Sequence, residues 1–299
     1  MRRCPCVVLA CCVLLSKPMS VAAQYIPAAY SLTAMGAWGV SDFLGGVGAR
    51  RANAFLFTSI VNLCGMAAVG AVALTMHAPF PESSSVIWSL LAGSVGGISL
   101  ALFFRALAGG NMGLVAPVAA VLGAAIPTVV TAFAEGFPGY RHMSGFVLAG
   151  IGVWLISRSE AGAGRPEGLG LAVLAGIGFA GFYLCIHQAG NASALWVAGC
   201  SRSASLLVTA AFVFFGRQLR AVPAPVLGIA VVAGVLDVSA STVFIRAAQI
   251  GRLDAAVVLS SLYPAVTVML ARIFLGEHFS RARTLGMIAA LVAVPMIAG

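Results

Sequence analysis

The chain contains ten apolar runs, and the second five repeat the pattern of the first five. The pattern Phe-x-Arg-Ala that begins at Phe103 recurs 141 residues later, beginning at Phe244. Because five is an odd number, the second copy must enter the membrane from the opposite side, and inverted repeats are a common plan of secondary transporters. The expected fold class is an all-α integral membrane protein with ten transmembrane helices in two inverted five-helix repeats.

Most of the apolar runs are long enough to cross a membrane. A helix needs ~20 residues to span ~30 Å of hydrocarbon. The longest polar stretch between runs, Arg158 to Glu167, joins the two copies. We therefore divide the chain into an N-terminal segment (1–23), a first repeat (24–160) and a second repeat (161–299). The expected spans lie at about 26–46, 54–76, 86–108, 113–134, 144–158, 167–187, 193–215, 225–248, 254–275 and 284–299.

Composition excludes a soluble domain. Charged residues make up 8% of the chain and apolar residues 61%, whereas about a quarter of an average soluble domain is charged. The net charge of +9 comes mostly from arginines in short loops, where positive charge orients a membrane protein. No zinc-type spacing and no nucleic-acid module is present, so nucleic acid is not an expected partner. The expected partners are the lipid bilayer and a small-molecule substrate, and small-residue faces such as Gly93-x-x-Gly96 would also allow a homodimer.

Residues 1–23 need an interpretation of their own. Met1-Arg2-Arg3 precede an apolar run that ends at Lys17. The run is too short for a span and is typical of the core of a signal peptide, with Val21-Ala22-Ala23 as a weak cleavage site. The alternative is a non-functional extension from an upstream start codon, and the sequence leaves both open.

Loop charge predicts an orientation. Eight arginines lie in odd-numbered loops, whereas the even-numbered loops carry only Arg141 and Arg252. By the positive-inside rule, the odd-numbered loops face the cytoplasm, and we expect a cell (inner or plasma) membrane. The first full span must then start outside, which a cleaved signal peptide or an extra N-terminal crossing would allow.

Three stretches carry a resemblance to a known family. They are Trp38 to Gly46, Arg105 to Pro117, and Leu259 to Thr267 running on to Leu275-Gly276-Glu277. In these residues the chain resembles EamA-type members of the drug/metabolite transporter superfamily, over about residues 26–299. The resemblance implies ten helices around a central cavity, export or exchange of small metabolites, and two cytoplasmic termini, which conflicts with the loop charge. The first copy departs from the pattern, because Leu122-Gly123 stand where the second has Tyr263-Pro264.

Asp237 is the first candidate for transport chemistry. A charge within a span adds at least ~2.5–3.5 kcal/mol to the free energy of insertion, so it persists with a partner, a watery cavity or a function. Asp237 lies near the middle of its span. We expect it to face the cavity and to bind a cationic group or exchange a proton. The alternative is a buried ion pair, with Arg202 of the preceding span as the candidate partner.

Four other residues leave two interpretations each. Arg105 and Arg246 are repeat mates near span ends, and they either snorkel to the interface or form a symmetric pair of anion anchors or gate residues. Asp42 lies about four residues from the end of its span, so it either lines the cavity or occupies a solvated helix end. Trp38 either stacks on a substrate or anchors its helix at the membrane interface.

Prolines predict kinks in two spans. Tyr263 and Pro264 interrupt the ninth span, and each proline frees a backbone carbonyl that a cavity or a neighbour can satisfy. The kinked helices either form a wall of the substrate site, to which Ser260 adds a hydroxyl, or simply bend. Two glutamates that begin loops are expected to make loop or helix-end contacts. The expected structural or hinge residues are Pro117, Pro127, Pro264, Glu135 and Glu277.

No motif indicates an enzyme. The four histidines fall at or near loops without spacing for a metal, and no Ser-His-acid order, HExxH or phosphate loop is present. We therefore expect no catalytic residue, metal or cofactor. The sequence favours a secondary active transporter that exports small organic metabolites or drugs, driven by a proton or substrate gradient. A channel-like permease and a non-transporting partner or sensor subunit are the alternatives.

Overall fold

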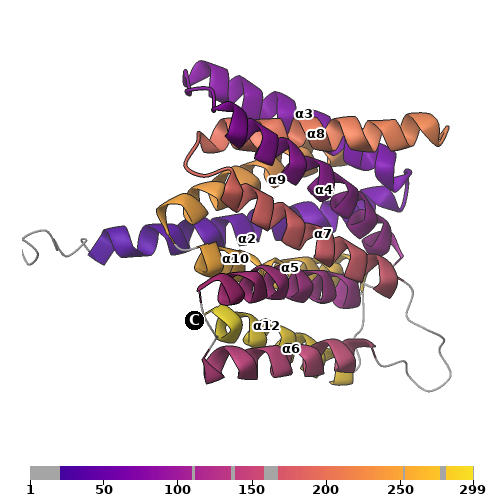
Figure 1. Cartoon of the computed structure of the whole chain (residues 1–299). Helices are drawn as coiled ribbons and strands as arrows, with labels where there is room; N and C mark the ends of the chain where they lie inside the picture. Colours follow the sequence, from indigo (N-terminus) through magenta and orange to yellow (C-terminus); the bar gives the residue numbers. More distant parts are fainter. Residues whose placement is uncertain are drawn as a thin grey trace, which may run out of the picture.

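The computed structural model describes residues 21–109, 112–135, 139–157, 168–251, 253–276 and 281–298. These residues form helices joined by short connections, with no strand among them (Figure 1). The helices are α2 (Val21–Ala49), α3 (Ala54–Thr75), α4 (Ser83–Ala108), α5 (Met112–Glu135), α6 (Tyr140–Ser157), α7 (Leu169–Gln188), α8 (Ala194–Phe215), α9 (Ala224–Ile250), α10 (Leu253–Ser260), α11 (Tyr263–Leu275) and α12 (Arg281–Ala298).

The bundle has the surface of a membrane protein. Within the described residues, six helices are long and apolar enough to cross a bilayer: α3, α4, α7, α8, α9 and, up to Val130, α5. Large aliphatic side chains such as Leu74, Leu207 and Ile273 point outward and are exposed, while phenylalanines and alanines fill the interior. Lipid tails solvate aliphatic side chains as well as a protein interior does, so this distribution fits a chain that crosses the membrane several times.

The main helix contacts link the two halves of the chain. The helix α2 packs along α9, and α4 packs along α7. The helices α3 and α8 pack against each other at one side of the bundle, and α6 and α12 at the opposite side (Figure 1). The two halves are therefore interleaved and do not form separate domains side by side.

Two helix crossings depend on glycine at equivalent positions of the two halves. A Cβ atom on Gly93 of α4 would overlap the backbone carbonyl of Ser201 in α8. A Cβ atom on Gly234 of α9 would overlap the carbonyl of Val61 in α3. The absence of a side chain lets the backbones touch, as is common between membrane helices. The Ser205 hydroxyl strengthens the first crossing by donating to the Gly93 carbonyl at 2.6 Å.

The helices α3 and α8 also end in the same way. His77 follows α3 with a φ of 49°, and Arg217 follows α8 with a φ of 51°. Each residue donates its backbone N–H to a carbonyl three residues earlier, at 3.1 Å in both cases. A left-handed residue after the last turn ends a helix by satisfying its free carbonyls, a role usually taken by glycine. Residue type did not predict these two turns, because residues other than glycine adopt a positive φ in only a few per cent of cases.

The expected ninth span, about 254–275, is divided in the structure. Ser261 and Leu262 form a turn between α10 and α11, and Pro264 lies in the first turn of α11, where the missing N–H leaves no bond broken. In the first half, α5 continues past both of its prolines. Thus Pro117 and Pro127 lie inside a continuous helix, whereas Pro264 lies in the first turn of a new helix.

The N-terminal boundary also differs from the expectation. The helix α2 begins at Val21, about five residues before the expected start of the first span, and continues across residue 23. Residues 1–20, which hold most of the expected signal-like segment, lie outside the described residues.

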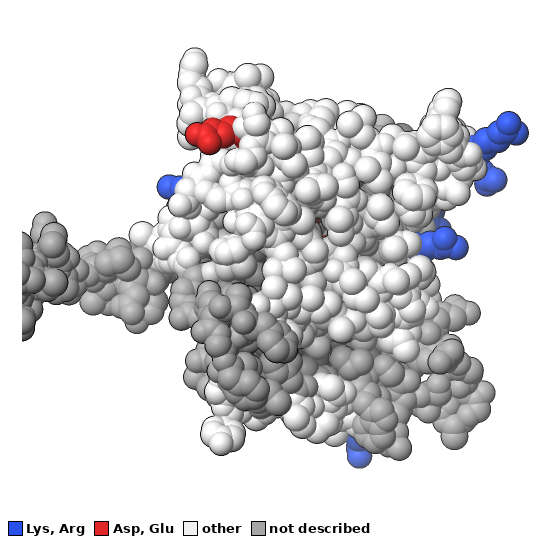
Figure 2. Space-filling view, viewed as in Figure 1, with Lys and Arg blue, Asp and Glu red and all other residues white. Residues whose placement is uncertain are grey.

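Exposed arginines gather at one end of the bundle. Arg50 and Arg51 follow α2, and Arg217 and Arg220 follow α8, all with exposed side chains. The helices α2 and α8 both end at the right of the view in Figure 1, and Figure 2 shows blue surface there and red surface on the opposite side. The arginine-rich loops after α2 and α8, both odd-numbered, therefore lie at the same end of the bundle.

The glycine crossings make a testable prediction. Gly93→Ala should lower the stability of the detergent-solubilised protein by about 1–3 kcal/mol, because α4 and α8 must separate to admit the methyl group. Gly70→Ala is the matched control, since a Cβ atom there has no atom within 4 Å. Thermal unfolding followed by size-exclusion chromatography measures both variants. Equal stability of the two variants would contradict the close-crossing interpretation.

Candidate functional site

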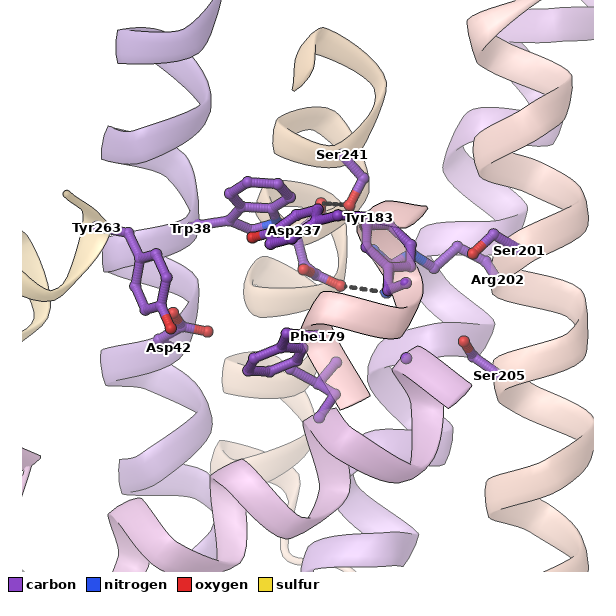
Figure 3. A pocket seen from close by; sticks show the side chains of 13 residues that line it. Trp38, Asp42, Phe179, Tyr183, Ser201, Arg202, Ser205, Asp237, Ser241 and Tyr263 are labelled. Atoms are coloured by element: carbon purple, nitrogen blue, oxygen red, sulfur yellow. Dashed lines mark hydrogen bonds and ion pairs between the residues drawn. The ribbon is translucent and has the colours of Figure 1, made fainter. Parts of the chain in front are cut away.

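A cavity of about 50 Å³ lies in the interior of the bundle, where six helices meet (Figure 3). Its volume is enough for a few water molecules. The lining side chains combine acidic, basic, hydroxyl and aromatic groups. They are Trp38 and Asp42 of α2, Gly96 and Leu100 of α4, Phe179, Phe182 and Tyr183 of α7, Ser201, Arg202 and Ser205 of α8, Asp237 and Ser241 of α9, and Tyr263 of α11.

An ion pair crosses one wall of the cavity. The Arg202 Nη1 atom lies 2.6 Å from the Asp237 Oδ2 atom, and both side chains are buried. Arg202 also donates from Nη2 to the Ser241 hydroxyl at 2.5 Å and from Nη1 to the Asn62 side-chain oxygen at 3.3 Å. The Trp38 indole interacts with the same Asp237 carboxylate. The network joins α2, α3, α8 and α9.

This network contains features of both sequence interpretations of Asp237. The carboxylate lines the cavity, as expected, and it is also paired with Arg202, as the alternative held. Two opposite charges in an apolar bundle persist when their attraction and additional hydrogen bonds offset the loss of water. The geometry therefore makes Asp237 a paired cavity residue, whose charge is balanced within the protein.

Asp42 is the second carboxyl of the cavity. Its side chain is 5% exposed, so the solvated helix end that the sequence left open is wrong. Asp42 lies one helical turn after Trp38, which places both side chains on one face of α2. The carboxyl interacts electrostatically with Asp237 and with the Tyr263 hydroxyl. Among the thirteen lining residues, Arg202 is the one base beside these two acids.

Aromatic rings form much of the remaining wall. Trp38 is 8% exposed and stacks at a tilt on Tyr183, with ring centroids 6.3 Å apart. Tyr183 in turn meets Phe182 edge to face at 5.6 Å. Trp38 therefore lies in the interior, and its expected alternative role as an anchor at the membrane interface is wrong. The buried hydroxyl of Tyr263 has no hydrogen-bond partner among the described residues.

A close contact between α2 and α11 positions Tyr263. The carbonyl of Tyr263 would lie 2.8 Å from a Cβ atom on Gly39, so glycine at that position lets α11 approach α2. The Thr267 hydroxyl also donates to the Gly39 carbonyl at 3.1 Å. The turn before α11 and this contact together direct the Tyr263 ring toward the cavity and Asp42 (Figure 3).

Other predicted site residues lie elsewhere. Arg105 and Arg246 are exposed near helix ends, and Arg246 donates to Gln249 at 3.4 Å. Neither arginine lines the cavity, a position that agrees with snorkelling. Ser260 is buried but donates to carbonyls of its own helix, at 2.6 Å to Ala256 and 3.1 Å to Val257. Glu277 and the side chain of Glu135 lie outside the described residues.

The prolines line a different hollow. Pro117 of α5 and Pro264 of α11 border a space of about 300 Å³ with apolar side chains of α11 and α12 and with Arg272. Of these two kinked segments, α11 contributes Tyr263 to the lining of the charged cavity and α5 contributes none of the lining residues. Pro127 does not line either space.

Sequence reasoning missed most of the cavity side chains. Phe179, Phe182, Tyr183 and Ser205 carry no signal in one sequence, because aromatic and hydroxyl residues are common in packed spans. Arg202 did carry a signal, since an arginine in the middle of a span is rare, yet the sequence suggested it only as a partner. The described residues contain no group of three potential metal-binding side chains.

Comparison with known proteins gives one family match and a match in fold. Residues 166–299 match the EamA-like transporter family. One solved structure, titled "Crystal structure of protein", superposes with a TM-score of 0.69 over 91% of this chain and 97% of its own, at 18% identity. At that identity the likeness concerns the fold alone. No curated protein matches this chain.

The buried ion pair predicts a non-additive pair of substitutions. Arg202→Met leaves the Asp237 carboxylate without its partner and should lower the free energy of unfolding by about 3–5 kcal/mol, whereas the double variant with Asp237→Leu should recover much of that loss. The exposed Arg246→Met control should change stability by about 0.5 kcal/mol or less. Denaturant titration of the purified protein tests this, and equal effects of Arg202→Met and Arg246→Met would contradict it.

Proposed function

We propose that this chain, whose second half belongs to the EamA-like transporter family, is a secondary active transporter that exports small organic metabolites or drugs. The family match indicates a multi-pass membrane transporter of the drug/metabolite transporter superfamily, and members of this family are transporters rather than enzymes. The observation that carries the proposal is the polar cavity at the meeting point of helices from both halves of the chain. Transporters built from repeats bind their substrates at that position.

The proposed architecture is ten spans in two inverted five-helix repeats. In this assignment α2 to α6 form the first repeat, α7 to α9 and α12 are spans of the second, and α10 with α11 makes one broken span. The helix packing supports this assignment. In it α2 corresponds to α7 and α4 corresponds to α9, so the observed contact of α2 with α9 is the counterpart of the contact of α7 with α4. The glycine crossings at Gly93 and Gly234 and the helix ends at His77 and Arg217 repeat in the same way.

Alternating access would open the cavity to each side in turn. The break between α10 and α11 lies next to Tyr263, so a change at this turn would move a lining residue directly. Broken helices at a substrate site are a recurrent feature of secondary transporters.

A gradient is the proposed energy source, since the sequence contains no phosphate-binding loop. We place the protein in the cell (inner or plasma) membrane, with the arginine-rich loops after α2 and α8 in the cytoplasm. This orientation follows from the loop charge and differs from the two cytoplasmic termini that the family resemblance implies.

A comparative metabolite profile of medium and cytosol tests the function. Cells express the wild type, Asp237→Asn, or no transporter, with the two proteins at matched membrane levels. We expect at least one small organic compound to be enriched outside only with the wild type, and its export to fall about tenfold in Asp237→Asn, because Arg202 is left as an unbalanced charge. Glu82→Gln, at an exposed position before α4, is the matched control. Identical profiles for wild type and empty cells would contradict export.

The energy source has its own test in proteoliposomes loaded with the exported compound. A secondary transporter should move the compound against its concentration gradient when a proton gradient is imposed, and a protonophore should abolish this uphill flux. Flux that only follows the compound's own gradient at a high rate would indicate the channel-like alternative. Flux that requires a second chain would indicate a partner subunit.

A further inference from the structure

A second hollow lies between α11 and α12 and shares no lining residue with the charged cavity. The two helices follow each other in the chain, yet α11 packs mainly on α2 and α5, and α12 packs mainly on α6 and α5. The space left between them measures about 300 Å³, compared with about 50 Å³ for the charged cavity. Pockets that hold ligands begin at about 300 Å³. Size alone therefore makes this hollow a candidate binding site.

The hollow is elongated, with a charge at one end. One face of α11 forms its long wall, because five lining residues recur there at helical spacing: Pro264, Ala265, Val268, Met269 and Arg272. The helix rises by about 12 Å from the first of these residues to the last. Seven of the nine lining side chains are apolar, and the single charged one stands in the last turn of α11. This combination suits a ligand with an apolar tail and an anionic head.

The hollow opens on the outer surface of the bundle. Met269 is 54% exposed and Ile288 is 52% exposed, on α11 and α12 respectively. In a membrane such a surface faces the acyl chains of lipids. Met269 and Met287 also give the wall flexible, polarizable side chains that adapt to the shape of an apolar ligand. A lipid chain can therefore enter the hollow sideways from the bilayer without crossing water.

Arg272 supplies the charge that would hold a head group. Its side chain is exposed and forms no hydrogen bond or ion pair within the described part of the chain. A charge that borders hydrocarbon is unfavourable unless it meets water or an opposite charge. A guanidinium binds phosphate oxygens through two parallel hydrogen bonds. Thr284, in the first turn of α12, lines the same space and places a hydroxyl-bearing residue there.

The charged end of the hollow lies where acidic lipids gather. The C-terminus is at the left of Figure 1, so α12 begins at the right, the end at which α2 and α8 also finish. The arginine-rich loops after α2 and α8 lie at that end, which the proposed orientation places in the cytoplasm. The cytoplasmic leaflet carries anionic lipids, and basic pockets between membrane helices on that side bind their head groups.

We propose that the hollow between α11 and α12 binds an anionic phospholipid of the surrounding bilayer, with its phosphate at Arg272 and one acyl chain along α11 towards Pro264. This lipid site goes beyond the proposed transport function and does not depend on which substrate is exported. It assigns a ligand to a space that the charged cavity does not use.

Other occupants fit the hollow less well. A transmembrane helix of a partner needs ~20 residues to cross the bilayer, whereas the long wall extends over about 12 Å. A lipid without net charge would leave the Arg272 guanidinium uncompensated. Inorganic phosphate would meet the arginine but would leave seven apolar side chains without a partner. An anionic phospholipid matches both the charge and the apolar wall.

Native mass spectrometry of the purified full chain in detergent tests the preference. The protein is titrated with dioleoyl phosphatidylglycerol, with dioleoyl phosphatidylcholine, which has the same chains and no net charge, and with oleate, a free fatty acid. We expect phosphatidylglycerol to bind at least about tenfold more tightly than either of the other two. Equal binding of phosphatidylcholine, or binding of oleate as tight as that of phosphatidylglycerol, would overturn the proposal.

Charge variants assign the head group to its residue. Arg272→Gln should lose the preference for phosphatidylglycerol over phosphatidylcholine, while Arg272→Lys, which keeps the charge, should retain part of it. Arg281→Gln is the matched control, because Arg281 is an exposed arginine at the start of α12 that does not line the hollow. This control should bind phosphatidylglycerol as the wild type does. Full preference in folded Arg272→Gln would contradict the head-group assignment.

A variant that fills the hollow assigns the acyl chain. Val268→Trp should weaken phosphatidylglycerol binding about tenfold, because the indole occupies the space of the chain. Ile273→Trp is its control, since Ile273 is 64% exposed on α11 and does not line the hollow. Size-exclusion chromatography shows which variants fold, and Ile288→Trp on the facing helix replaces Val268→Trp if the latter does not. Wild-type affinity in a folded, filled variant would show that the lipid binds elsewhere.

Discussion

The ion pair between Arg202 and Asp237 is the interaction on which the centre of the bundle depends. Neither charge could remain alone among apolar helices, because the loss of water around a single buried charge is larger than any nearby packing could offset. Paired, the two side chains join α8 to α9, and hydrogen bonds to Asn62 and Ser241 extend the connection to α3. The pair also balances one acid of the cavity against its one base, because Arg202 lies against Asp237 and Asp42 is the second buried carboxyl of the lining.

The helices that carry the pair approach their other neighbours closely. The crossings at Gly93 and Gly234 bring α4 against α8 and α9 against α3 with backbone in contact. Gly39 does the same for α11, which brings the Tyr263 ring to the cavity. In a bilayer, such contacts replace the hydrophobic effect as the source of helix association. The glycine positions therefore set the helix spacing that places side chains around the cavity.

Much of the helical structure could be predicted from one sequence. Apolar runs without charge have few alternatives to membrane helices, and the α-helix bounds fall within a few residues of most expected spans. The broken span at Ser261–Leu262 was indicated by Tyr263 and Pro264. The early start of α2 at Val21 and the left-handed ends at His77 and Arg217 were not predicted, because these features depend on local turn geometry rather than on hydropathy.

The sequence by itself determined the class of the protein, the length and number of its apolar runs, and the presence of rare charges within them. These properties follow from the transfer of side chains between water and lipid, which each residue undergoes independently of its distant neighbours. Only the tertiary structure decided that Asp237 pairs with Arg202, that Asp42 and Trp38 face the interior, and that Arg105 and Arg246 do not. Those outcomes depend on which helix faces meet across the two halves, and contacts between residues far apart in the chain leave no periodic signal in a single sequence.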